Sequence, residues 1–154
     1  MGECRAMAYE ELKLEHQLCF KIYALHRELM AAYRPLLDEL GVTYPQYITL
    51  LYLWEYEEAT VGQLCNALGL DTGTVSPLLK RMEVNGLVAK RRLVSDERTV
   101  MVSLTERGKA LEEEARSIPS HMASCLFGDD ETGARSLASV LDQTIRQLVE
   151  TRKQ

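Results

Sequence analysis

The chain lacks the features of membrane and fibrous proteins. No apolar run reaches the roughly 18 residues that a membrane-spanning helix needs. The stretch before Leu14 carries acidic residues and no apolar segment of the kind found in signal peptides. Proline and glycine are scarce, at 4 and 9 of 154 residues, while 46% of the residues are apolar and 27% are charged. These values predict a helix-rich globular protein with a cytoplasmic location and no membrane partner.

Metal-binding motifs are also lacking. The four cysteines stand at positions 4, 19, 65 and 125, and none forms a C-x-x-C pair or has histidines at zinc-finger spacing. His16 and Cys19 lie three residues apart, but no further ligand follows nearby. We therefore expect no metal and no cofactor. In a reducing compartment these thiols stay free, so a disulfide would act as a signal and not as a structural link.

Positive charge is scarce overall but concentrated in one region. The formal net charge is −5, with 18 basic and 23 acidic residues. Eight of the basic and four of the acidic residues lie between Lys80 and Lys109, which leaves ten basic and nineteen acidic residues elsewhere. The local balance is therefore +4 against −9 for the rest of the chain. A basic patch on an acidic body attracts phosphate locally, although charge alone would also fit an ordinary solvated surface.

Apolar residues recur every three or four positions from Leu14 to Leu40, which predicts a long amphipathic helix. They form two neighbouring stripes, and the second one contains Cys19, Tyr23, His26 and Tyr33. A face this wide exceeds what a single packed helix covers, so we expect it to form an intersubunit surface. Pro35 is expected to kink this helix or to end its regular part.

Capping signals mark two short helices in the middle of the chain. Thr60 and Gln63 fit a capping box for a helix that runs through Leu68. Gly69 then supplies a turn, and Asp71 caps a second helix that ends near residue 85. Another helix is predicted before them, from about residue 45 to residue 56. The pair with its glycine turn has the pattern of a helix-turn-helix.

The pattern then changes to short alternating runs. Residues 88–93 and 99–104 predict the two strands of a hairpin with a charged tip at 94–97. Thr105 caps a helix to about Ser117, which continues past a break near Pro119 whose position the sequence does not fix, and a last helix ends near Val149. The expected fold is mainly α with a small β-hairpin wing. It is a winged helix-turn-helix in the order α-α-α-α-β-β-α-α.

The second helix of such a unit enters the major groove, where base edges can be distinguished. Here its start carries hydroxyl groups, basic residues follow one turn later, and the hairpin adds arginines. The expected DNA contacts are Thr72, Thr74, Ser76, Lys80, Arg81, Arg91, Arg92 and Arg98, with Asp96 orienting Arg98. The alternative is a winged helix that contacts proteins and carries these charges as ordinary surface residues.

The stretch DTGTVSPLLKRMEVNGLVAKRRLVSDERTVMVSLTERG, residues 71–108, resembles the MarR family of dimeric repressors. The specific marks are the D-x-R wing at 96–98 and the L-T-x-x-G sequence at 104–108. The resemblance implies one domain, 1–154, with dimerisation helices at 12–40 and 105–152 and a winged helix-turn-helix at 45–104. It further implies a homodimer on a palindromic operator in double-stranded DNA, with Arg98 in the minor groove.

Within that family, residues 16–47 are similar to the organic-hydroperoxide regulators of the OhrR group. The shared motifs are Q-L-C-F around Cys19, Y-x-P-L-L from Tyr33 and T-Y-P-Q-Y at 43–47. The resemblance implies that Cys19 is a reactive cysteine and that Tyr23 and Tyr33 assist it. Phenol hydroxyls can donate hydrogen bonds to a thiolate, which is the form that attacks a peroxide. Tyr33 stands about 21 Å from Cys19 along a helix, so an antiparallel partner subunit must supply it.

The expected cycle converts Cys19 to a sulfenic acid, which then condenses with a second thiol and causes release of DNA. Cys125 is the candidate second thiol by resemblance to the two-cysteine members, and a small cellular thiol is the alternative. Cys65 is expected in the core and Cys4 on the surface, and His26 has no assigned role. Cys19, Tyr23 and Tyr33 could instead be inert core residues.

Two other functions compete with this one. A MarR-type repressor could release DNA when a non-covalent aromatic or phenolic ligand enters the dimer cleft. A thiol peroxidase would turn over repeatedly with a reductant, but it would leave the basic 80–109 segment without a purpose. The leading prediction is therefore a dimeric transcription repressor that senses organic hydroperoxides and is not an enzyme.

Overall fold

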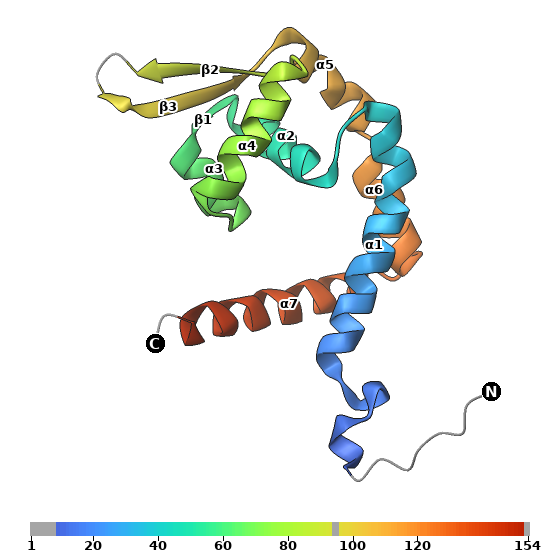
Figure 1. Ribbon diagram of the computed structural model, residues 1–154. Coiled ribbons are helices and arrows are strands. Elements are labelled where there is room, and N and C mark those ends of the chain that lie inside the picture. Colours follow the sequence, from blue (N-terminus) through green and yellow to red (C-terminus); the bar gives the residue numbers. More distant parts are fainter. Residues whose placement is uncertain (1–8, 94–95, 153–154) are drawn as a thin grey trace, which may run out of the picture. The chain divides into compact units, whose positions relative to one another are not determined.

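The computed structural model describes residues 9–93 and 96–152, with side chains omitted at 93–98 (Figure 1). The chain forms two compact units, Met1–Lys109 and Ala110–Gln154. No helix in the described ranges is both long enough and apolar enough to cross a membrane. The elements are η1 Glu10–Leu12, η2 Leu14–His16, α1 Leu18–Leu40, α2 Tyr44–Tyr56, β1 Glu58–Thr60, α3 Val61–Leu68, α4 Thr72–Val84, β2 Val88–Leu93, β3 Asp96–Leu104, α5 Glu106–Ala115, α6 Ile118–Phe127 and α7 Glu131–Thr151.

Helix α1 begins four residues later than the sequence pattern predicts. Leu14–His16 forms a separate 3-10 turn, and Gln17 has extended backbone angles that interrupt the helix before Leu18. Pro35 does not end α1, which continues for another turn to Leu40. Gly41 ends it in the left-handed region, with φ of 65°, where a glycine carries no Cβ penalty.

The helix-turn-helix forms as the caps predict. Thr60 Oγ1 accepts the N–H of Gln63 at 3.1 Å, while Gln63 Oε1 accepts the N–H of Thr60 at 2.8 Å. Gly69 turns the chain with φ of 64° between α3 and α4. Asp71 caps α4 by accepting the N–H of Thr74 at 2.9 Å. Helix α3 packs against α4, and α2 contacts both.

The wing is an antiparallel sheet in the order β1-β3-β2. The hairpin of β2 and β3 confirms the two predicted strands, which project beside α4 in Figure 1. The second strand is longer than predicted: β3 begins at Asp96, within the stretch expected to form the tip, because Asp96 pairs with Leu93. The sequence analysis missed β1, whose residue Glu58 lies opposite Ser103 of β3. Buried apolar side chains from α2, α3, α4 and the sheet form the core beneath this unit. They include Leu50, Leu53, Leu64, Val75, Leu79, Met82 and Val102.

A hydrogen-bonded junction joins the end of α4, the start of β2, and α2 to the beginning of α5. Thr105 Oγ1 donates to the carbonyl of Gly86 at 2.6 Å and accepts the N–H of Gly108 at 3.1 Å. The N–H of Thr105 donates to the carbonyl of Leu87 at 3.1 Å. From α2, Trp54 Nε1 donates to the carbonyl of Gly108 at 2.9 Å.

The C-terminal unit contains a break that the sequence did not fix. The predicted helix to Ser117 ends at Ala115, and α6 starts as a new helix with Pro119 in its first turn. Helix α6 contacts α7. None of the described α7 side chains is buried. Its exposed apolar residues are Leu137, Val140, Leu141, Ile145, Leu148 and Val149.

Candidate functional site

The start of α4 presents the three predicted hydroxyl residues on the surface. Thr72, Thr74 and Ser76 are all exposed. Thr74 Oγ1 donates to Asp71 Oδ2 at 3.2 Å, and Thr72 Oγ1 lies 3.8 Å from the half-buried thiol of Cys65. The hydrogen bond from the backbone N–H of Thr74 is the largest of the causes that lower the pKa of the Asp71 carboxyl. The cap therefore stays ionised and fixes the hydroxyl-bearing turn.

A shallow groove of about 400 Å³ runs along this hydroxyl-bearing surface. It brings together the starts of α3 and α4 with the strand β3, which are separate in the sequence. Its lining residues are Thr60, Val61, Gly62, Thr72, Ser76, Thr99 and Val100. Sequence reasoning missed Thr60 and Thr99 as part of this surface, because only the sheet register brings them beside α4.

Lys80 and Arg81 lie exposed farther along α4. They line a second groove of about 500 Å³ together with the α1–α2 turn. Within the part of the chain that the structure describes, neither side chain has an ion-pair partner. Both cations are therefore available to a polyanion.

Two basic residues of β2, unlike Lys80 and Arg81 of α4, form ion pairs. Arg91 is exposed but pairs with Glu58 of β1, with Nη2 and Oε2 2.8 Å apart. The adjacent Lys90 pairs with Glu83 of α4 at 2.8 Å. Arg92 is exposed. The side chains of Asp96 and Arg98, both predicted at the wing tip, lie outside the described residues. Sequence reasoning treated Arg91 as a reaching cation and did not foresee its pairing with Glu58.

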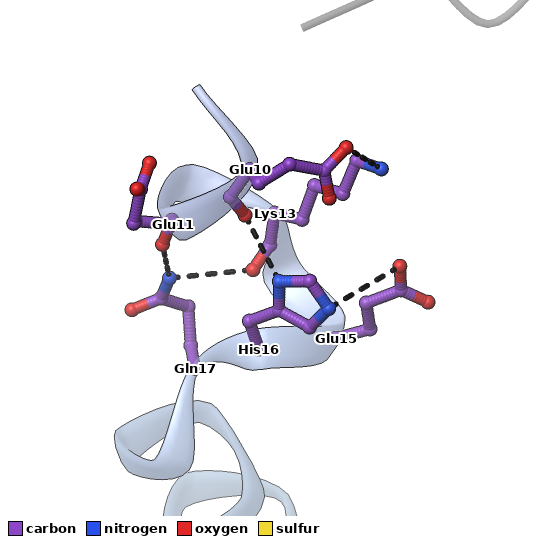
Figure 2. Close-up of polar contacts among 6 residues, drawn as sticks. All are labelled: Glu10, Glu11, Lys13, Glu15, His16 and Gln17. Carbon is purple, nitrogen blue, oxygen red and sulfur yellow. Dashed lines mark hydrogen bonds and ion pairs between the residues drawn. The ribbon is translucent and has the colours of Figure 1, made fainter.

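Cys19 is exposed near the start of α1. Phe20 and Tyr23 follow it in the sequence, and their rings stack on each other with centroids 6.5 Å apart. Polar contacts hold the segment before the helix (Figure 2). There the Gln17 amide donates to the carbonyl of Lys13 at 3.3 Å, and His16 Nδ1 lies 2.9 Å from the carbonyl of Glu10. Side chains within residues 10–17 thus hold the backbone of the segment that precedes Cys19.

Tyr33 belongs to a cluster of three tyrosines between α1 and α2. Its ring centroid lies 4.9 Å from that of Tyr44 and 6.1 Å from that of Tyr47. Burial raises the pKa of Tyr33, and Tyr44 raises it further, so the phenol stays protonated and can donate a hydrogen bond. Sequence reasoning missed Tyr44, although the T-Y-P-Q-Y motif contains it. Because α1 is continuous, Cys19 and Tyr33 of one chain stay about 21 Å apart along it.

The other cysteines and His26 do not belong to the tyrosine cluster. Cys125 is exposed on α6, with Sγ 3.5 Å from His121 Nε2. His26 is exposed on α1. Cys65 is half-buried, and Cys4 lies outside the described residues. Across residues 9–93 and 96–152, no group of three or more potential ligands suits a metal ion.

Comparisons with known proteins place this architecture in a family. Residues 31–115 match the family model described as transcriptional regulator SarA/Rot. The organic hydroperoxide resistance transcriptional regulator of Bacillus subtilis is 46% identical over 141 residues, which covers 90% of this chain and 96% of that protein. The transcriptional regulator MgrA of Staphylococcus aureus is 33% identical, covering 94% and 98%.

A solved structure also matches closely. Reduced AbfR bound to DNA has a TM-score of 0.74 and 33% identity, covering 92% of this chain and 99% of that chain. The two curated relatives are transcriptional regulators and AbfR was solved on DNA, which supports the expected class of DNA-binding regulator. A MarR transcriptional regulator from Methanosarcina mazei shares the fold, with a TM-score of 0.72 at 24% identity, covering 84% of this chain and 94% of that chain. The chain therefore belongs to the SarA/Rot family of DNA-binding transcriptional regulators, with a relative at 46% identity that is an organic hydroperoxide resistance transcriptional regulator.

Proposed function

We propose that the chain is a homodimeric repressor that binds a palindromic operator and releases it when an organic hydroperoxide oxidises Cys19. The observation that carries the proposal is an exposed cysteine on the apolar α1 of a chain 46% identical to an organic hydroperoxide resistance regulator. AbfR, a relative at about one-third identity, has been solved in reduced, overoxidised and disulfide forms.

A second copy of the chain would cover apolar surfaces that one copy leaves open. On α1, Leu18, Ile22 and Leu25 are 69%, 46% and 38% exposed. The apolar face of α7 is likewise exposed. Contiguous apolar surface of this kind marks an interaction site. Pairing through these helices gives the two-fold symmetry that a palindromic operator requires.

Such a dimer also completes the sensor. Cys19 of one subunit would lie against the tyrosine cluster of its partner, because its own Tyr33 is too far along α1. Tyr33 and Tyr44 are neighbouring phenols and would both donate hydrogen bonds to the thiolate. Tyr23 lies one turn beyond Cys19 on the same helix. The surrounding apolar side chains favour an organic peroxide over hydrogen peroxide.

The chemistry balances with the peroxide as the oxidant. The Cys19 thiolate attacks the terminal peroxide oxygen, the O–O bond breaks, and the leaving alkoxide takes a proton to become an alcohol. The sulfenic acid then condenses with a second thiol, forming an S–S bond and releasing water. That thiol is Cys125 or a small cellular thiol. AbfR is also bound to DNA when overoxidised, so we place DNA release at the disulfide step.

The test follows DNA binding during oxidation. Fluorescence anisotropy with a selected inverted-repeat duplex is measured before and after cumene hydroperoxide is added. Wild-type protein is expected to release DNA and to regain binding after reduction, and Cys19→Ser is expected to stay bound. Cys65→Ser is the matched control and should behave as wild type. Mass spectrometry then identifies the partner thiol. Release of DNA by the Cys19→Ser protein would refute the proposal.

A second candidate is release by a non-covalent aromatic ligand. A cavity of about 240 Å³ lies beside the tyrosine cluster, between α1 and α2, and includes the exposed Arg34. This volume is below the roughly 300–1,000 Å³ of typical ligand sites, which favours the redox proposal. Salicylate added in place of the peroxide separates the two, since only the ligand model predicts release without oxidation.

A further inference from the structure

An ion pair spans the wing from one edge strand to the other. Arg91 of β2 lies opposite Met101 of β3, and Glu58 of β1 lies opposite Ser103 of β3. Strand β3 separates the two edge strands, so the Arg91 side chain crosses it to place Nη2 2.8 Å from Glu58 Oε2. The pair therefore ties both edges of the sheet together on one face.

This pair is open to solvent, so a phosphate that approaches the wing can compete for Arg91. The side chains of Arg91 and Glu58 are 55% and 43% exposed. Exposed pairs are weak, because water and salt screen them and two long side chains must be held in place. The Lys90–Glu83 pair differs, since its lysine is only 25% exposed and packs toward α4. Of the two pairs, Glu58–Arg91 is thus the one that a phosphate can open.

We propose that Glu58 is an internal competitor of DNA phosphate for Arg91. While the pair is closed, the two charges cancel and Arg91 adds nothing to the field that attracts DNA. Binding through Arg91 requires the guanidinium to exchange a carboxylate for a phosphate. Glu58 therefore lowers the affinity for any duplex and lowers the number of counterions released. This inference rests on DNA binding alone and not on the redox proposal.

The experiment measures how binding to a short mixed-sequence duplex depends on salt, between about 50 and 200 mM. The proteins are wild type, Glu58→Gln, Arg91→Gln and the double variant, all as the full chain. Glu58→Gln is expected to bind about two- to fivefold more tightly per subunit. Its log–log salt slope should steepen by about one per subunit. In the Arg91→Gln background, the Glu58 substitution should add no gain.

Glu57→Gln is the matched control, because it removes the same charge one residue away. Within the described chain Glu57 has no ion-pair partner. An equal gain from Glu57→Gln, or a Glu58→Gln gain that persists without Arg91, would reduce the effect to general charge and overturn the inference. Unchanged or weaker binding by Glu58→Gln would also overturn it, and weaker binding would show that Glu58 positions Arg91. Thermal unfolding of each variant checks that the wing remains folded.

Discussion

Gly108 occupies a position in α5 where a side chain has no room. A Cβ built there would lie 2.1 Å from the carbonyl oxygen of Leu87, whereas real Cβ contacts essentially never fall below 3.0 Å. Gly108→Ala therefore requires a backbone shift of at least 0.9 Å, the difference between those two distances. That shift would strain the Trp54 and Thr105 hydrogen bonds at the junction.

Gly108→Ala is expected to destabilise the protein, which is the opposite of what a glycine-to-alanine change usually does inside a helix. Replacing a helical glycine with alanine normally stabilises by up to about 1 kcal/mol. Overpacking a close contact costs about 1–3 kcal/mol and each weakened hydrogen bond about 1 kcal/mol. With both hydrogen bonds weakened, we expect a net destabilisation of about 2–4 kcal/mol, which lowers Tm by about 4–16 °C for a chain of this size.

Thermal unfolding followed by circular dichroism measures this change. The matched control is Gly62→Ala in α3, where the nearest atom to the added Cβ is Thr60 Oγ1 at 3.9 Å. That variant should keep its Tm or gain slightly. A Gly108→Ala protein as stable as wild type would refute the packing argument at the junction.

Two further features of α4 give separate predictions. The pKa of Asp71 is lowered on folding, so its stabilising effect is present above about pH 3.8 and is lost as pH falls through the folded value. Asp71→Ala should therefore lower urea stability near neutral pH, and the difference from wild type should shrink in acid. Replacing Lys80 and Arg81 with glutamine should weaken DNA binding and flatten the salt slope by up to about 0.9 per lost phosphate contact; an unchanged slope would remove them from the interface.

Local signals predicted most of the fold correctly. The caps at Thr60 and Asp71 and the turn at Gly69 each act within a few residues, so the sequence alone located α3 and α4. The three-residue strand β1 escaped prediction because its pairing partner, Ser103, is 45 residues away from Glu58. No local pattern distinguishes such a short strand from a loop.

The same difference between local and long-range signals applies to the candidate site. Exposure of Thr72, Ser76 and Lys80, which are spaced four residues apart, follows from their shared helix face, which periodicity reveals. The pairing of Arg91 with Glu58 and the contact between the tilted rings of Tyr33 and Tyr44 depend on tertiary structure. Sequence reasoning singled out Arg91 and Tyr33 but not Glu58 or Tyr44, so it assigned neither pairing.

The junction at Thr105 bears on how a signal can reach DNA. Its hydrogen bonds join the residues between α4 and β2, through the carbonyls of Gly86 and Leu87, and the indole of Trp54 to one short stretch of backbone. A displacement of that stretch would therefore be passed to α4 and to the hairpin together. In the dimer that we propose, each unit would therefore reach its half-site already assembled, and oxidation would act on the separation and tilt between the two units.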